Sequence, residues 1–292
     1  MTVHLTHPER VLYADAAITK ADLAAYLEQV APVMLPHLAR RVVSLVRCPE
    51  GAAKACFFQK HASAGMPDAL HTTPVTEKDG EAEDYLFIDS ADGLVAAAQI
   101  GTLEFHIWGS HVETIEQPDR MVFDLDPDPS VAFGAVKQAA IDIRDALQAL
   151  GLESFPLLTG GKGIHVVVPI EPEAEWPRIK AFADTLARRF AEDEPDRFVA
   201  TMSRAQRTGK IFIDHFRNER GSTAIAPLSP RARPGAPLAW PVDWDALPDF
   251  KAANTVTIGN VGEHDPGASW QRYFGLRQRL SDAVFEALGV EA

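Results

Sequence analysis

The stretch MVFDLDPDPS, residues 121–130, decides the fold, because a short apolar run leads directly into Asp124 and Asp126. Side chains alternate between the two faces of a β-strand, so a strand over 121–125 directs both carboxylates to the same face. Carboxylates held that close raise one another's pKa unless a cation lies between them. Oxygen ligands suit Mg²⁺ or Mn²⁺, so the pair predicts a metal site. The alternative is a solvated strand end that enters an Asp-Pro turn.

The composition is that of an ordinary globular chain with an acidic balance. The 292 residues are 46% hydrophobic, which is enough for a sizeable core. Most nucleic-acid-binding domains carry a basic excess, so a net charge of −13 argues against a nonspecific DNA coat but allows a locally basic cleft. The N-terminal segment has no apolar signal sequence, and no run approaches the roughly 20 apolar residues of a membrane span. We therefore expect a cytoplasmic protein.

The cysteine content is low. Cys48 and Cys56 are too few and wrongly spaced for a disulfide framework or a zinc site. We expect buried free thiols in a reducing compartment.

Periodicity predicts a mixed α+β chain. Thr19 is expected to cap a helix that reaches about residue 30 and is broken beyond it by Pro32 and Pro36. Residues 228–248 are rich in proline, but Trp240 and Trp244 favour an ordered loop because large aromatic side chains tend to be buried. Other helices are expected over 92–100, 131–150, 174–191 and 267–288, and strands over 42–46, 55–59, 85–88, 103–108, 121–125, 155–158, 163–170 and 211–216. Strands and helices do not alternate strictly, which favours α+β over a doubly wound sheet.

A glycine cluster, LLTGGKGIHVVVPI, occupies residues 157–170. Successive glycines let backbone N–H groups form an anion-binding nest, to which Lys162 and the Thr159 hydroxyl add a cation and a donor. The cluster is not a P-loop, because Gly163 follows the lysine and a strand follows that. His165 shares a strand face with Gly163. The alternative is a tight glycine hairpin with a chance lysine.

A third stretch, residues 203–237, contains an apolar strand that ends in Asp214. This would place a third carboxylate on another strand of the same sheet, and three carboxylates can hold two divalent cations. Its basic residues indicate a substrate rich in phosphate; they are Arg207, Lys210, Arg217, Arg220, Arg231 and Arg233. The alternative is a solvated basic face beside an apolar strand.

Taken together, DxD, TGGKGxH and the segment IFIDHFRNERGSTAIAPLSPRARPGAP resemble the polymerase domain of bacterial DNA ligase D, a branch of the archaeo-eukaryotic primase superfamily. The similarity runs from HPERVLY, residues 7–13, to the Trp244 region. It implies one primase-polymerase domain over 1–292, with an N-terminal lobe of about 1–110, a catalytic lobe of about 111–292 and an antiparallel catalytic sheet flanked by helices. Neither a ligase adenylation motif nor a nuclease module is found in the sequence, so the domain is expected to stand alone.

The resemblance also assigns roles in catalysis. It implies that Asp124, Asp126 and Asp214 bind two divalent ions, Mn²⁺ in preference to Mg²⁺, which activate a primer 3′-hydroxyl and steady a nucleoside triphosphate. The residues expected to hold that triphosphate are Thr159, Gly160, Lys162 and His165, assisted by Arg207 and Arg231. His106, in LEFHIW, matches a family histidine near the catalytic centre; the alternative is an ordinary strand histidine.

Contacts with DNA are implied in the N-terminal lobe. Arg10 and Lys20 match a pocket for the 5′-phosphate of the downstream strand, and Arg10 departs from the lysine of many relatives. Phe57 and Phe58 match a pair that packs on the template base. Adjacent strand residues face opposite ways, so we expect only one of them to stack on a base unless the strand ends there, and the core competes for the other.

The function so implied is a metal-dependent, DNA-templated nucleotidyltransferase. It would add ribonucleotides, and deoxyribonucleotides, to 3′ ends at gaps or double-strand breaks during non-homologous end joining. The expected partners are gapped or broken DNA with a 5′-phosphate, Ku and a separate DNA ligase, and we expect a monomer on the nucleoid. One alternative is a metal-dependent phosphodiesterase, which has no need of the glycine-lysine loop. Another is a noncatalytic end-binding module, which has no need of three aspartates.

Overall fold

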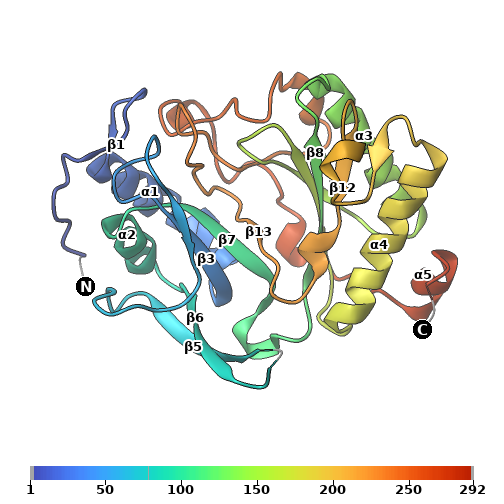
Figure 1. The fold of residues 1–292 in the computed structure, drawn as a ribbon, viewed down its shortest axis with the longest axis horizontal. Helices are drawn as coiled ribbons and strands as arrows, with labels where there is room; N and C mark the ends of the chain where they lie inside the picture. The colour runs from blue at the N-terminus through green and yellow to red at the C-terminus, as the bar shows by residue number, and fades with distance from the viewer. Residues whose placement is uncertain (1–2, 78, 291–292) are drawn as a thin grey trace.

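The fold is described from a computed structural model, over residues 3–77 and 79–290 (Figure 1). Its first sheet has six strands in the order β13-β7-β3-β6-β5, with β4 paired to β3. These strands are β3 (Arg41–Arg47), β4 (Phe57–Gln59), β5 (His71–Thr76), β6 (Ala82–Phe87), β7 (Thr102–His111) and β13 (Ala224–Ile225). A separate two-stranded sheet, β1 (Val11–Tyr13) and β2 (Ile18–Thr19), precedes it in the chain.

The second sheet also has six strands, in the order β11-β12-β8-β10-β9-β14. They are β8 (Arg120–Pro127), β9 (Phe155–Leu158), β10 (Ile164–Pro169), β11 (Phe198–Val199), β12 (Ile211–Asp214) and β14 (Trp240–Pro241). All neighbours are antiparallel except β11 and β12. Figure 1 shows this sheet in the right half of the view and the first sheet in the left half, with β13 beside β7 although it follows β12 in the chain. The mixed α+β class is confirmed.

The first helix is longer than expected. α1 (Lys20–Leu38) begins at Thr19, whose side chain forms the predicted N-cap in a capping box with Asp22. The helix does not end before Pro32 and Pro36, so the predicted break is wrong. Both prolines are exposed, whereas the opposite face of the helix is buried on both sides of them. Packing of that face outweighs the cost of about 3 kcal/mol that an interior proline carries.

The other helices are α2 (Ala91–Gln99), α3 (Phe133–Ala149), α4 (Trp176–Asp193) and α5 (Asp282–Ala287). The helix expected over 267–288 is wrong, because only a 3₁₀ turn at Tyr273–Gly275 and α5 form there. The buried Trp270 has a left-handed φ of 63° and donates from Nε1 to the carbonyls of Pro156 and Val242. Tertiary contacts thus override the helical periodicity. In the part of the chain that the structure describes, no helix is long and apolar enough to cross a membrane.

The aspartate-bearing face of the second sheet is set by strand alternation. Met121, Phe123 and Leu125 on β8 belong to the main core with residues of α3 and α4, and both helices contact β8. Asp124 and Asp126 therefore project from the opposite face, as the alternation of β8 predicts. The two helices cover one side of the sheet. On the other side Val122 belongs to a second hydrophobic cluster with Trp270 and Tyr273, and the stretch of β8 that carries Asp124 and Asp126 is left for a site.

Two further features differ from the sequence-based expectation. Cys48 and Cys56 form a disulfide with Cα atoms 4.4 Å apart, so the expectation of free thiols is wrong. Cys48 follows β3 and Cys56 precedes β4, and the antiparallel pairing of Arg47 with Phe57 brings the two cysteines together. β5 was also not expected; it is the edge strand next to β6, where Pro74 is tolerated.

The segment over 228–248 is ordered, as predicted. Trp240 is buried and lies in β14, which pairs with β9. Trp244 is partly buried and donates from Nε1 to the Ser154 carbonyl. The two tryptophans therefore anchor this proline-rich segment over the end of the second sheet.

Candidate functional site

Three polar side chains form a row across adjacent strands of the second sheet. Asp124 on β8 pairs with Asp214 on β12 on one side and with His165 on β10 on the other. Paired residues of antiparallel strands direct their side chains to the same face. The third carboxylate thus lies on another strand of the same sheet, as predicted, and directly opposite the first.

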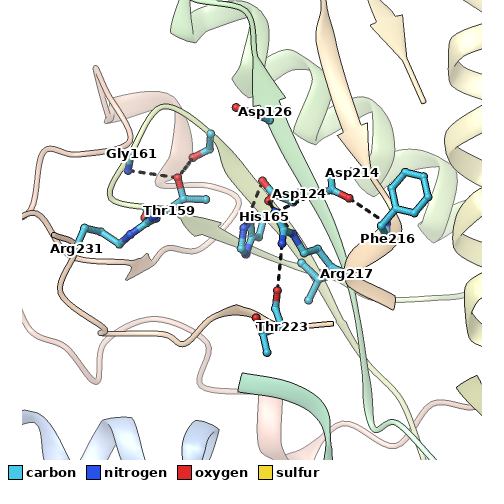
Figure 2. Close-up of polar contacts among 12 residues, drawn as sticks. Asp124, Asp126, Thr159, Gly161, His165, Asp214, Phe216, Arg217, Thr223 and Arg231 are labelled. Carbon is cyan, nitrogen blue, oxygen red and sulfur yellow. Dashed lines mark hydrogen bonds and ion pairs between the residues drawn. The ribbon is translucent and has the colours of Figure 1, made fainter. Parts of the chain in front are cut away.

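A partly buried arginine connects the two carboxylates of this row. Arg217 Nη2 lies 3.2 Å from Asp124 Oδ2 and 2.9 Å from Asp214 Oδ2, and His165 Nε2 lies 3.4 Å from Asp124 Oδ1. Figure 2 shows these four side chains converging, with Asp126 farther along β8. Burial opposes the ionisation of Asp124, but His165 and Arg217 overcome it and hold the pKa of this carboxyl well below its usual range. Asp124 is therefore a carboxylate at neutral pH.

The other two carboxylates are shifted in the opposite direction. Burial and the charge of Asp124 raise the pKa of Asp214, although Arg217 opposes the shift. Partial burial and Asp124 also raise the pKa of Asp126. Asp126 is the most exposed of the three, with 60% of its side chain accessible, and its nearest cation is Arg207 at 3.7 Å. Negative charge on this face is thus only partly compensated by the protein's own cations.

The donor set suits a hard divalent cation, since all three acids offer oxygen ligands from one sheet face. Within residues 3–77 and 79–290, however, no three His, Cys, Asp or Glu side chains lie close enough together to hold a metal ion in the arrangement described. The positive charge between Asp124 and Asp214 is the Arg217 guanidinium. The guanidinium shows that a positive charge is stabilised between the two carboxylates. It would have to move away before both carboxylates could bind a metal ion.

The glycine loop between β9 and β10 is the predicted hairpin, and hydrogen bonds hold it in shape. The Thr159 hydroxyl donates to the Gly163 carbonyl at 3.0 Å and accepts from the Gly161 amide at 3.3 Å. The Gly160 amide donates to the Ala253 carbonyl at 3.0 Å. Two of the amides expected to form an anion nest are therefore used within the protein. The exposed Lys162 is the loop's own cation for an anionic ligand.

Gly163 is required by close packing at the start of β10. A Cβ on this residue would lie 2.3 Å from the Leu125 carbonyl oxygen and 3.8 Å from Asp124 Oδ1. A flexible side chain could move away from such a close contact, but the backbone of β8 cannot. The glycine therefore lets the loop lie directly against the strand that carries the aspartates.

A cavity of about 550 Å³ brings most of the predicted site residues together. Its lining includes His106, Asp124, Asp126, Thr159, Lys162, His165, Arg207 and Arg231 from the predicted set. Asp214 and Gly160 are not among the residues that line it, although Asp214 pairs with the lining residue Arg217. The lining adds Arg217 and Arg233, two of the basic residues that indicated a phosphate-rich substrate, and Arg204, which was not singled out from the sequence. The position of Arg204 in the basic stretch 203–237 was the available signal for it.

His106 and Arg231 enter the cavity from the side of the first sheet. Both contact Glu104 of β7, at 2.7 Å from His106 Nε2 and 3.2 Å from Arg231 Nε. Glu104 was not singled out from the sequence. Its place two residues before His106 on one strand, and hence on the same face, was the only signal for it.

The predicted phosphate pocket is a second, smaller cavity of about 210 Å³ beside α1. Arg10 and Lys20 both line it, together with Arg47. The buried Lys20 donates from Nζ to the carbonyls of Thr6 and Gln99 at 2.8 and 3.1 Å. Burial and the charge of Arg10 lower the pKa of Lys20. Three basic side chains thus converge in one hollow, which suits a small anion.

Phe57 and Phe58 are both exposed, with 48% and 67% of their surface accessible, so neither of them is part of the core. They face opposite ways, as adjacent strand residues must. The Phe58 ring lies 5.5 Å from the ring of His106, at the first cavity. The Phe57 ring lies 5.3 Å from the guanidinium of Arg47, at the second. Neither ring lines a cavity itself, but each contacts a residue of a different cavity.

Comparisons with known proteins agree with this geometry. A family model described as the LigD primase-polymerase domain matches residues 19–266. The multifunctional non-homologous end joining protein LigD of Pseudomonas aeruginosa is 37% identical over 98% of this chain, and that of Mycolicibacterium smegmatis is 35% identical over 85%. The chain spans 34% and 32% of these two relatives, about a third of their length.

A solved structure extends the similarity to three dimensions. The polymerase domain of Mycobacterium tuberculosis ligase D in complex with DNA matches with a TM-score of 0.83 and 29% identity, over 93% of this chain and 97% of that one. The primase-type architecture that the motifs implied is thereby confirmed. From the match over most of its length, the chain belongs to the LigD primase-polymerase family.

Proposed function

We propose that this protein is a metal-dependent nucleotidyltransferase that extends DNA 3′ ends at gaps or double-strand breaks in end joining, with ribonucleotides preferred over deoxyribonucleotides. The observation that carries the proposal is the pairing of Asp124 with Asp214 beside a cavity lined with arginine and lysine. Carboxylates serve to bind metal, whereas the cations serve to bind phosphate. A phosphodiesterase needs the metal-binding carboxylates but not the cations for a triphosphate. The presence of both therefore favours nucleotide transfer from a nucleoside triphosphate.

Asp124, Asp126 and Asp214 would hold two divalent ions, for which Mn²⁺ is the preferred candidate. Bound there, the ions would lower the pKa of the primer 3′-hydroxyl and neutralise charge on the triphosphate. The protein's own contribution is geometric, because β8 and β12 hold the carboxylates on one rigid sheet face. Such preorganisation lowers the cost of bringing the reacting groups together.

The triphosphate would lie along the cationic wall of the first cavity. Lys162 projects from the glycine loop, and Arg207 is held with its guanidinium 3.6 Å above the ring of Phe212. Arg233 lies close to Gly161, whose absent Cβ would be 3.6 Å from the Arg233 Cζ atom. We propose that these three cations bind the phosphates, with Thr159, Gly160, His165 and Arg231 shaping the surface beneath them.

DNA would cross the first sheet. Arg10 and Lys20 are proposed to bind the 5′-phosphate of the downstream strand, and Phe58 to stack on the template base beside the first cavity. This arrangement corresponds to the proposed division into an N-terminal lobe of about 1–110 and a catalytic lobe of about 111–292. The similar M. tuberculosis domain was solved in complex with DNA.

The setting of the reaction follows from the relatives, which are named for non-homologous end joining. We propose that the protein acts as a monomer in the cytoplasm, on DNA of the nucleoid. Ku would deliver broken ends to it, and a DNA ligase activity would seal the product.

The deciding experiment is primer extension on a one-nucleotide gap with a 5′-phosphate, comparing UTP with dTTP in Mn²⁺. We expect extension that favours UTP and that disappears in Asp124→Ala, with unchanged circular dichroism. No extension alongside tight binding to the gap would instead indicate a noncatalytic end-binding module. Activity retained in Asp124→Ala would contradict the assignment of the metal site.

The phosphate pocket is tested separately with Lys20→Met, which keeps most of the apolar stem. Losing a charged donor should reduce the preference for 5′-phosphate over 5′-hydroxyl gaps by roughly tenfold, on the scale of one charge-assisted hydrogen bond. Lys180→Met on α4, outside both cavities, serves as the matched control. Equal loss on both DNA ends would show that the pocket does not read the phosphate.

A further inference from the structure

A buried carboxylate on β7, that of Glu104, contacts two residues that line the first cavity, His106 and Arg231. Only 9% of the Glu104 side chain is exposed, and its two oxygens have different partners. Oε1 accepts from the Ala232 amide at 2.8 Å, whereas Oε2 contacts His106 Nε2 at 2.7 Å and Arg231 Nε at 3.2 Å. Burial opposes ionisation of Glu104, but His106 and Arg231 overcome it and lower its pKa to about 2. Glu104 is therefore an anion at neutral pH.

This anion determines which nitrogen of His106 carries the proton. Burial lowers the pKa of His106, so that its ring is neutral at pH 7. A carboxylate can only accept a hydrogen bond, so the neutral ring must donate to Glu104 from Nε2. The Nδ1 atom is then an acceptor, and within the described residues it has no hydrogen-bond donor. His106 is one of the residues that line the cavity, where a ligand could donate a hydrogen bond to Nδ1.

The same anion holds Arg231 against the glycine loop. Arg231 Nη1 donates to the Thr159 carbonyl at 2.6 Å. The stem of Arg231 crosses the place where a side chain on Gly160 would stand, because a Cβ there would lie 2.8 Å from Arg231 Cγ. A continuous path therefore leads from Glu104 through Arg231 to the loop that we assign to the triphosphate.

We propose that Glu104 is a positioning residue for the nucleoside triphosphate: it fixes His106 as the Nε2–H tautomer and Arg231 in its place against the glycine loop. Glu104 does not line the cavity and would not touch the nucleotide. The proposal rests on the proposed function for the identity of the ligand. The tautomer, by contrast, is a property of the protein alone.

The first test is a long-range ¹H–¹⁵N spectrum of the wild-type protein labelled in histidine, with His106 assigned from a His106→Phe sample. We expect a neutral ring with its proton on Nε2 at pH 7. A proton on Nδ1, or a charged ring, would overturn the proposal. This measurement needs no Glu104 variant, so it stands even if such a variant fails to fold.

The second test uses Glu104→Gln, in which one of the two oxygens becomes an NH₂ group and the charge is lost. If the remaining oxygen keeps the Ala232 amide, the NH₂ group meets His106 and forces the ring to the Nδ1–H tautomer. We expect that switch in the spectrum, together with a KM for UTP raised by roughly ten- to hundredfold, the range for losing hydrogen bonds to a charged group.

Controls separate positioning from a merely structural role. Glu113→Gln, which removes a carboxylate that pairs with Arg40 just beyond β7, should change neither the tautomer nor KM. Combining Glu104→Gln with Arg231→Met should raise KM by much less than the product of the two single effects, because both break the same path. Multiplicative effects, or a wild-type KM in Glu104→Gln, would overturn the proposal. A protein with the expected tautomer but no nucleotide addition would instead refute only the proposed function.

Discussion

Asp214 lies directly opposite Asp124 in the β8–β12 register, and one guanidinium, that of Arg217, bridges the two carboxylates. The arginine and any divalent cation would compete for the same oxygen atoms. Like charges repel, so binding of a metal must displace Arg217 or weaken its two ion pairs. Strand pairing thus sets the two aspartates opposite one another, and Arg217 holds their side chains together.

Arg217→Met should therefore strengthen metal binding. We expect the affinity for Mn²⁺, measured by isothermal titration calorimetry, to rise by about tenfold or more, since a positive charge is removed from within about 4 Å of the site. The melting temperature of the variant should fall without Mn²⁺ and recover with it.

Arg220→Met is the matched control for this prediction, because Arg220 pairs with Glu116, at 2.7 Å, and contacts none of the three aspartates in the part of the chain that the structure describes. Unchanged Mn²⁺ affinity in Arg217→Met, with Asp124→Ala still abolishing binding, would show that Arg217 does not compete with the metal.

Gly163→Ala should damage both stability and activity. The new methyl group would approach the Leu125 carbonyl to 2.3 Å, which only a shift of β10 or β8 could relieve. We expect a loss of roughly 1–3 kcal/mol in the free energy of unfolding by urea titration, the usual cost of overpacking. Gly134→Ala on α3, where nothing lies within 4 Å of the new methyl group, provides the comparison and should be neutral or stabilising. Equal stability of the two variants would contradict the close approach.

Phe58→Ala and Phe57→Ala should have different effects, because the two rings contact residues of different cavities, His106 and Arg47. Loss of Phe58 should weaken templated addition and reduce discrimination against mismatched nucleotides, on the scale of about 1–3 kcal/mol for one base–aromatic stack. Loss of Phe57 should act mainly on binding of the 5′-phosphate end, beside Arg47. Both readouts come from one gap-filling assay with matched and mismatched templates. Identical profiles for the two variants would count against separate roles.

Glu104 should contribute to the pH dependence of the free energy of unfolding. Its pKa falls from 4.5 to about 2 on folding, so its contribution is complete above pH 4.5 and is lost as the pH falls toward 2. The shift corresponds to about 3 kcal/mol. Urea unfolding between pH 6 and pH 2.5 should therefore show a weaker pH dependence in Glu104→Gln than in the wild type. If the free energy of unfolding changed with pH equally in the two proteins, the pKa of Glu104 would not be lowered by its partners in the folded protein.

The local structure could be predicted from the sequence wherever it depends on neighbours a few residues apart. The alternation of β8 put Asp124 and Asp126 on one face, and the preference of threonine for the N-cap placed the start of α1 at Thr19. The glycine hairpin between β9 and β10 was predicted on the same grounds. In each case the signal lies within one strand, turn or helix end.

Only the tertiary structure decided the relationships between distant segments. The register that sets Asp214 against Asp124, the disulfide of Cys48 and Cys56, and the contacts of Glu104 with Arg231 all join residues that share no local period. The same contacts overrode local signals, as in the unbroken helix through Pro32. Sequence patterns determined which face of a strand each functional side chain occupies, whereas strand pairing and burial determined which side chains meet, because register and packing are properties of the whole core.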